Sequence, residues 1–194
     1  MLMPDRDDQW RAVVGPWSPH RDARIINGHS QRIFSYGQDG YSYTLRLGTT
    51  FKVPNPYKDG LVDPKHLQDD DFIEVEAEVH PVTDERYIVI PPQSFVLGNI
   101  VEYLDIPPSH LALFFGKSSY GRVGINPYVT PGEPGWRGDL VVEICNNWPG
   151  RPVKVYCNEG ILAMVLLRGE QPCRTTYEDR QGRYQNQQGI QVTR

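Results

Sequence analysis

The chain has 194 residues, of which 39% are hydrophobic and 11% aromatic, and this composition is typical of one globular domain. The formal net charge of −4 excludes the basic excess of duplex-binding proteins, so we expect no nucleic-acid partner. The sequence has no run of 18 apolar residues, and residues 1–8 have no apolar signal core. We therefore expect a single domain over residues 1–194, with no membrane span and a cytoplasmic location.

The N-terminal third gives mixed signals. Residues 5–13 (DRDDQWRAV) predict one short helix with Asp5 as its cap, and residues 14–40, rich in Gly, Pro, His and Arg, predict irregular structure. Alternation of apolar and polar residues at 41–47 predicts a strand. Residues 54–71 are polar, acidic and contain proline. We interpret them as a solvated surface loop, with an acidic binding surface as the alternative.

Short strands follow, separated by turn residues. Strict alternation predicts a strand at 72–79, and apolar runs predict others at 87–90, 95–104, 111–115, 140–144, 153–156 and 161–167. The 17 prolines and 18 glycines exclude long uninterrupted helices. Seven or more short strands of this kind indicate a mainly β fold, either a barrel or a sandwich, with few short helices.

The first candidate for ligand chemistry is residues 116–122 (GKSSYGR). Backbone amides of such a turn, with the hydroxyls of Ser118 and Ser119 and the charges of Lys117 and Arg122, form a good phosphate cradle. The alternative is a polar turn in which a serine caps a short helix. The spacing is not that of a Walker loop.

The second candidate is Glu143, which stands inside the apolar strand at 140–144. If its face of the strand is buried, the pKa of the carboxyl rises, which is how a general base active near neutral pH is made. The alternative is an outward-facing glutamate on an edge strand.

The third candidate is the polar tail at 177–189 (YEDRQGRYQNQQG), which carries Arg180 and Arg183. A segment this polar is typical of a disordered terminus. Its aromatic and cationic residues equally fit a lid that orders over a phosphate ligand.

Four motifs stand in a fixed order along the chain. They are residues 116–122, residues 129–131 (VTP) with 134–136 (PGW), residues 143–146 (EICN), and the tail pattern of Tyr177, Tyr184, Gln187 and Gly189. Together they resemble the dCTP deaminase family of the dUTPase-like superfamily. The resemblance is strong over residues 116–189 and weaker upstream, where residues 35–37 and 41–53 are similar to the family's first hairpin.

The resemblance implies a distorted β-barrel of the dUTPase-like, β-clip type that assembles as a homotrimer with active sites between subunits. It implies binding of a deoxycytidine nucleotide and hydrolytic deamination of dCTP to dUTP and ammonia, which feeds dUMP and dTTP synthesis. It also implies that residues 174–194 form a lid over the nucleotide and that dTTP is a candidate inhibitor.

The resemblance also assigns roles to single residues. Glu143 would activate water for attack on C4 of cytosine, and Ser118 and Arg122 would orient the water, the carboxylate and the phosphates. Backbone at Thr130 and Pro131 would read the cytosine amino edge. The substrate-binding residues would be Lys117, Ser118, Ser119, Arg122, Thr130, Pro131, Glu133, Trp136, Tyr177, Arg183 and Gln187.

The residue content indicates chemistry without a catalytic metal. Zinc deaminases need H-x-E and P-C-x-x-C spacing, whereas here no histidine follows His110 and Cys145, Cys157 and Cys173 form no C-x-x-C pair. We interpret the cysteines as small hydrophobic residues. No cofactor is expected for catalysis, and Mg²⁺ would be bound with the triphosphate.

Some positions depart from the family. Arg183 replaces a lysine, Glu133 replaces an aspartate that contacts the 3′-hydroxyl, Tyr128 replaces His or Asn, and Thr44 replaces an aspartate. These departures leave dCTP, dCMP and a modified deoxycytidine nucleotide open as substrates.

Two other functions compete with deamination of dCTP. One is a dUTPase or a bifunctional deaminase and diphosphatase, which Glu133 in a shortened turn disfavours. The other is a nucleotide-binding protein without turnover, which the presence of both Glu143 and Arg122 disfavours.

Overall fold

The computed structural model describes residues 7–26 and 28–192, and it begins with the helix α1 (Asp7–Val13). This helix confirms the prediction for residues 5–13, whereas the proposed cap Asp5 lies outside the described residues. Trp10 of α1 is fully buried, and its ring centroid lies 5.8 Å from that of Tyr43. No helix in the described ranges is long and apolar enough to cross a membrane.

Most of the ordered chain is β-strand, which confirms the mainly β prediction. The strands are β1 (Val14–Gly15), β2 (Arg21–Ile26), β3 (His29–Gln38), β4 (Tyr43–Pro54), β5 (Phe72–Glu76), β6 (Glu78–Val79), β7 (Arg86–Ile90), β8 (Ser94–Asp105), β9 (His110–Gly116), β10 (Ile125–Tyr128), β11 (Arg137–Asn146), β12 (Val153–Tyr156) and β13 (Gly160–Arg168). The 3₁₀ turn η1 (Asp69–Asp71) and the one-turn helix α2 (Ser118–Gly121) interrupt them.

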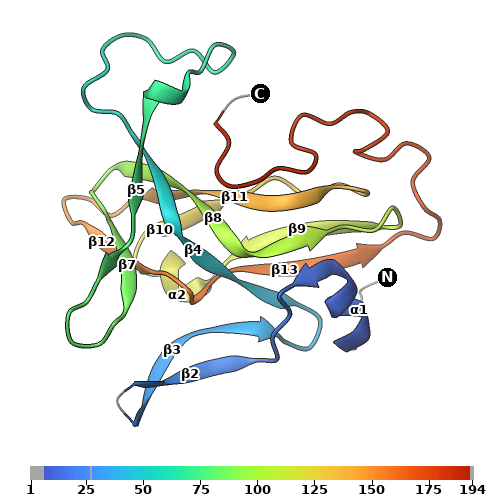
Figure 1. Ribbon diagram of the computed structural model, residues 1–194, viewed down its shortest axis with the longest axis horizontal. Helices are drawn as coiled ribbons and strands as arrows, with labels where there is room; N and C mark the ends of the chain where they lie inside the picture. The colour runs from blue at the N-terminus through green and yellow to red at the C-terminus, as the bar shows by residue number, and fades with distance from the viewer. Residues whose placement is uncertain (1–6, 27, 193–194) are drawn as a thin grey trace.

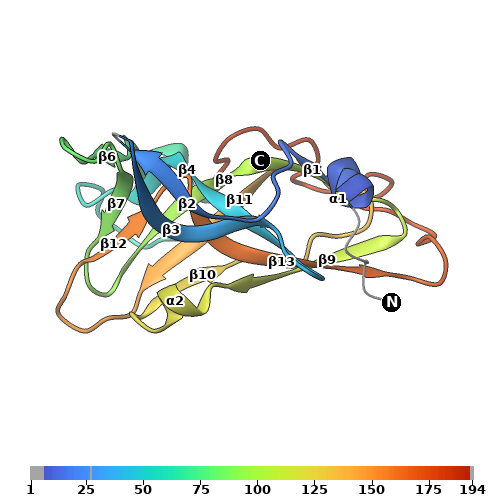
Figure 2. The same ribbon diagram turned by 90° about the horizontal axis from the view of Figure 1, so that it is seen from below.

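The strands form two antiparallel sheets (Figures 1 and 2). The main, ten-stranded sheet follows the path β10-β11-β8-β4-β13-β9, with β1, β2, β3 and β5 attached at its sides. A smaller sheet has the order β12-β7-β6. Strand β11 lies inside the main sheet, paired with β10 on one side and β8 on the other, which fixes both neighbours of its side chains.

In the described part of the chain, this path does not close into a hydrogen-bonded barrel. Ala112 of β9 exchanges two hydrogen bonds of 2.9 Å with Gly132 in the loop after β10, and this single bridge joins the two ends of the path. Pro127 of β10 has no N–H to donate, and a Cβ added at Gly116 would lie 2.9 Å from its Cδ. The predicted distorted barrel is thus an open, curved sheet joined at one point.

The prediction of irregular structure at 14–40 is wrong, because this segment contains the β2–β3 hairpin. Its strands pair from Arg21↔Tyr36 to Ile26↔His29, and Gly28 turns the chain with φ of +79°. The hairpin projects from the body of the molecule in Figure 1. Most of its described side chains outside the last part of β3 are exposed, so the sequence lacks the apolar alternation that reveals a half-buried strand.

Two smaller differences concern a break within a predicted strand and a strand that was not predicted. The strand predicted at 72–79 is broken at Ala77, whose N–H leaves the ladder to bond Thr49 O at 2.7 Å. Strand β10 follows the phosphate-cradle motif where no strand was predicted, because its proline conceals the pattern.

Candidate functional site

Glu143 lies on the outer face of a central strand. Along β11, Leu140, Val142 and Ile144 are buried in the core, and Glu143 points to the opposite face. Its directly paired neighbours are Tyr128 of β10 and Leu97 of β8. In the single chain, Glu143 therefore faces outward, as the alternative interpretation of the sequence expected. The strand that carries it is not an edge strand, because β11 has a paired neighbour on each side.

A cavity of about 760 Å³, which we call the carboxylate cavity, opens at this outer face. Its lining residues come from β5, β8, β9, β11, the loop before β11, the 54–71 loop and the tail: Leu67, Phe72, Leu97, Leu111, Val129, Thr130, Pro131, Gly132, Glu133, Trp136, Leu140, Val141, Glu143, Tyr177, Tyr184, Gln187, Gln191 and Val192. Many of these side chains are apolar. The cavity therefore provides a carboxylate in apolar surroundings, which suits a general base.

The surroundings of Glu143 shift its protonation equilibrium. Solvent reaches the side chain through the mouth of the cavity, yet burial against its neighbours raises the pKa of the carboxyl above its ordinary value. Burial, with the nearby Glu143 charge, also raises the pKa of the Cys145 thiol, so this thiol stays protonated near neutral pH.

The loop between β10 and β11 brings four predicted substrate residues to the same cavity. Thr130 and Pro131 are exposed at its rim, Glu133 is half-buried, and Trp136 is buried. The indole Nε1 of Trp136 donates to Tyr184 O at 3.0 Å, which fixes the ring against the tail. The predicted base-reading and sugar-packing residues thus surround Glu143 within one chain.

The tail follows a defined path along its own chain, visible in Figure 1 as the red segment beside β11. The N–H of Asp139 donates to Gln187 O at 2.9 Å, and Gln187 Nε2 donates back to Asp139 O at 2.8 Å. Gly138 permits this approach, because its φ is +149° and an added Cβ would lie 2.9 Å from Gln187 N. Tyr177 and Gln187 line the carboxylate cavity, and the amide of Gln187 attaches the tail to β11.

The phosphate-cradle motif forms the turn between β9 and β10. Lys117 precedes α2, and its backbone N–H donates to Ile161 O at 3.1 Å. Beneath the turn, the buried Tyr120 accepts a hydrogen bond of 2.9 Å from Tyr156 N. This anchoring leaves Ser118 and Ser119 exposed at the surface.

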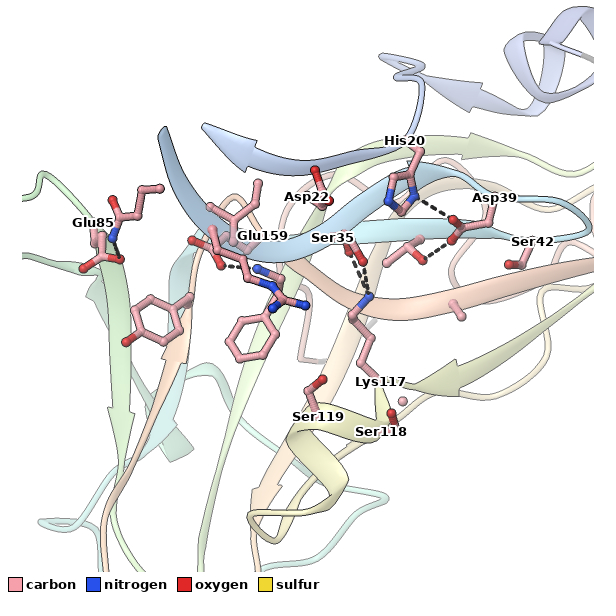
Figure 3. A pocket seen from close by; sticks show the side chains of 18 residues that line it. His20, Asp22, Ser35, Asp39, Ser42, Glu85, Lys117, Ser118, Ser119 and Glu159 are labelled. Atoms are coloured by element: carbon pink, nitrogen blue, oxygen red, sulfur yellow. Dashed lines mark hydrogen bonds and ion pairs between the residues drawn. The ribbon is translucent and has the colours of Figure 1, made fainter. Parts of the chain in front are cut away.

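These residues line a second space of about 950 Å³, the lysine cavity, whose wall on the far side is β3 (Figure 3). Lys117 Nζ donates to both the carbonyl oxygen and the Oγ of Ser35, each at 2.9 Å. Burial lowers the pKa of this ammonium group. Lys117, Ser118 and Ser119 therefore line one cavity, with the lysine held against β3.

The lysine cavity contains polar residues that the sequence did not single out. Asp39 faces His20 in Figure 3, and its carboxylate lies 2.7 Å from His20 Nδ1. The same carboxylate accepts a hydrogen bond of 3.2 Å from the Oγ1 of Thr44. Glu159 is buried and accepts a hydrogen bond of 2.8 Å from Phe34 N. They come from separate strands and loops, so no spacing in the sequence could have connected them.

Within one chain, the predicted site residues are divided between the two cavities. Glu143 shares no lining residue with the cavity of Lys117, Ser118 and Ser119. Arg122 is exposed at the end of α2 and Arg183 is exposed on the tail, and neither cavity is lined by them. The carboxylate and the predicted phosphate donors are therefore separate in a single chain.

Two further residues of the predicted loop at 54–71 and its following strand contribute to the site. Leu67 and Phe72 form part of the wall of the carboxylate cavity. The loop is mainly solvated, as predicted, but it is also a boundary of this cavity. In the sequence, the signal for this contribution was Leu67, an apolar residue within a polar segment.

Comparisons with known proteins identify the family of this chain. The family described as dCTP deaminase-like matches residues 20–169. A dCTP deaminase from Acidobacterium capsulatum is 37% identical over 95% of this chain and 96% of its own, and one from Chlamydia caviae is 42% identical over 96% and 97%.

A solved structure shares the fold. The 2′-deoxycytidine 5′-triphosphate deaminase from Agrobacterium tumefaciens superposes with a TM-score of 0.53 at 18% sequence identity. The match covers 87% of this chain and 48% of that chain, so this chain spans about half of the solved one. Together with the match over residues 20–169, these findings show that the chain belongs to the dCTP deaminase-like family.

Proposed function

We propose that this protein is a dCTP deaminase, which replaces the amino group of dCTP with oxygen from water to give dUTP and ammonia. One observation supports this most: Glu143 lies in an apolar cavity that also contains Thr130, Trp136 and Tyr177. Proteins named dCTP deaminase match this chain over nearly its whole length. This arrangement supports the proposal, because the residues that would act as the base, read the cytosine and pack on the sugar all line one cavity.

The proposed reaction uses Glu143 as a proton shuttle. The carboxylate takes a proton from water while the water oxygen bonds to C4 of cytosine and the C4=N3 π electrons move to N3, which receives that proton from Glu143 and gives a tetrahedral intermediate. Glu143 then takes the hydroxyl proton of the intermediate and passes it to the amino group, the C4–N bond breaks as the C4=O bond forms, and ammonia leaves with the electron pair of the broken bond. Carboxylate base catalysis of this kind contributes about 10²–10⁴-fold, and positioning supplies more.

The rim residues would recognise the nucleoside. Backbone groups at Thr130 and Pro131 are exposed at the cavity, where the cytosine amino edge would lie. Trp136 would pack on the deoxyribose, since its ring lines the cavity while its Nε1 is already bonded to Tyr184. Glu133 would accept a hydrogen bond from the 3′-hydroxyl.

A homotrimer would complete the site. In one chain, the triphosphate donors lie apart from Glu143, so we place Lys117, Ser118, Ser119 and Arg122 of one subunit beside Glu143 of the next. Ser118 and Arg122 would orient the attacking water and the phosphates. Tyr177, Arg183 and Gln187 would close the tail over Mg²⁺-bound dCTP, with Gln187 acting through its attachment to β11.

The donor set supports water activation by a carboxylate. Zinc deaminases hold their metal with His and Cys ligands, and the described part of the chain contains no group of three or more His, Cys, Asp or Glu side chains placed to hold a metal.

The pH dependence should reflect the environment of Glu143. The base acts in its ionised form, and its raised pKa means that the ionised form is lost at a higher pH than for an ordinary glutamate. We expect kcat/KM to fall with decreasing pH through a midpoint above about 4.3, the usual glutamate value. Measuring kcat/KM between pH 4 and 8 tests this, and a midpoint at or below the usual value would contradict it.

The function itself is tested by ammonia release. Purified protein incubated with Mg²⁺ and dCTP should release one ammonia per dUTP formed, with dCMP and 5-methyl-dCTP as competing substrates. Pyrophosphate release from dUTP would reveal the bifunctional alternative. Absence of ammonia with all of these nucleotides would overturn the proposal. Inhibition by dTTP stays a prediction, which the same assay measures.

A further inference from the structure

An ion pair connects the tail to the sugar-binding end of the carboxylate cavity. Arg180 Nη2 bonds Glu133 Oε2, and the two side chains are 48% and 46% exposed. The guanidinium carbon of Arg180 also lies 5.6 Å from the ring centroid of Tyr177, which lines the same cavity. Arg180 thus contacts two residues that line the cavity, Glu133 and Tyr177, and is not itself one of its lining residues.

The charges that line the carboxylate cavity indicate what the Arg180–Glu133 ion pair does. Among the described residues that line it, the charged ones are Glu133 and Glu143, and none is Lys, Arg or His. A nucleotide triphosphate would therefore meet two carboxylates. Arg180 neutralises one of them without entering the cavity, which reduces the repulsion and leaves Glu143 as the reacting carboxylate.

The pair also fixes the geometry of Glu133. A glutamate side chain has three rotatable bonds, and a half-exposed one must lose that freedom when it binds a ligand. The ion pair uses Oε2, and Oε1 has no hydrogen bond with any residue in the described ranges. One oxygen is thus held and the other is left to accept a hydrogen bond, which is the arrangement that preorganises an acceptor.

We propose that Arg180 is a positioning residue that sets selectivity for nucleotides with a 3′-hydroxyl, acting through Glu133. The inference rests on the proposed function, in which Glu133 accepts the hydrogen bond of that hydroxyl. Because Arg180 belongs to the tail, the sugar contact is complete only when the tail is docked. Recognition of the sugar and closure of the tail are therefore coupled by one ion pair.

The test compares dCTP with 2′,3′-dideoxycytidine triphosphate, which lacks the hydroxyl. We expect the wild type to prefer dCTP by about tenfold or more in kcat/KM, the range for a hydrogen bond to a charged group. In Arg180→Gln this preference should fall by up to about fivefold, the upper end of the range for an exposed ion pair. Arg180→Lys should restore part of it, since the charge is kept and the planar fork is lost.

A second tail variant separates selectivity from tail docking. Glu178 forms another ion pair between the tail and the body, with Arg137 Nη2 at 2.7 Å, and this pair does not include Glu133. Glu178→Gln should therefore leave the preference unchanged, even if it raises KM for both nucleotides. Equal loss of preference in both variants, or no loss in Arg180→Gln, would overturn the inference.

The same experiment distinguishes failure of the proposed function. If the wild type released ammonia from dCTP and Arg180→Gln kept the full preference, only the role of Arg180 would be overturned. If the wild type turned over neither nucleotide, the function would fail and the inference with it.

Discussion

Replacing Glu143 by glutamine should reduce deamination of dCTP by about 10²–10⁴-fold or more while leaving binding of Mg²⁺-bound dCTP nearly unchanged. An amide has the shape of the carboxylate but cannot take a proton from water. The substitution also replaces a carboxyl group whose pKa is raised mainly by burial, so loss of its charge should cost the folded chain little stability. Ammonia release and calorimetric titration with dCTP measure the two halves of this expectation.

Folding of the Glu143→Gln variant is the required control. The side chain is reachable by solvent and its neighbours Val142 and Ile144 hold the strand in the core, so the thermal midpoint should stay close to that of the wild type. Retained activity would show that another group acts as the base. Loss of folding together with activity would show that Glu143 has a structural role.

The second large effect is expected from mixing two inactive variants. Glu143→Gln and Arg122→Ala should each be inactive alone, because each removes one part of every site. If a site combines Glu143 of one subunit with Arg122 of a neighbour, random mixed trimers contain about one quarter of sites with both groups intact. Mixing, after dissociation and reassembly, should therefore restore about a quarter of wild-type activity.

The recovery is diagnostic because a site within one chain gives the opposite result. Each variant chain would then lack one group in every site, and no mixture could restore activity. Each variant reassembled by itself provides the baseline. Absence of recovery, with mixed oligomers demonstrated by mass spectrometry, would rule out the shared site.

The sequence was sufficient for the strands that have one face in the core. Along β8 and β11, buried and less buried residues alternate, as in the positions from Leu140 to Ile144, and this period is visible in the sequence. The sequence did not predict the β2–β3 hairpin, because much of the hairpin has no buried face and therefore shows no alternation of apolar and polar residues. Prediction from periodicity thus follows burial, and it fails where a strand is stabilised by pairing alone.

The same distinction applies to the motif residues. The sequence predicted a common site for Glu143, Thr130 and Trp136, and these residues line one cavity because they lie on adjacent parts of one loop and strand. It gave no warning that Ser118 lies in another cavity, since that depends on where β9 and β10 meet in the fold. The separation became visible only with the strand pairing.

Some motif residues support the structure around the site. Asn146 is fully buried and donates from Nδ2 to Ile90 O at 2.9 Å and to Arg151 O at 3.0 Å, while Oδ1 accepts from Trp148 N at 2.9 Å. These hydrogen bonds therefore fix the C-terminal end of β11, the strand that carries Glu143. The sequence motif contains both Asn146 and Glu143, and the motif alone does not distinguish the residue that supports the strand from the one that would contact the ligand.

The buried charges could not be foreseen from spacing. Glu102 of β8 is fully buried and accepts from the Nε of Arg46 at 2.7 Å and from its backbone N–H at 2.9 Å. Along the chain it is one polar residue in a strand, and 56 residues separate it from its partner. Such a pair is costly to bury unless its hydrogen bonds are complete, and here they fix β4 against β8.

The most direct measurement is a crystal structure of the Glu143→Gln variant with Mg²⁺ and dCTP. We expect C4 of cytosine beside position 143, with the deoxyribose on Trp136 and the triphosphate on Lys117, Ser118 and Ser119 of a neighbouring subunit. A base bound outside the carboxylate cavity, or phosphates held far from that turn in every subunit, would contradict the account.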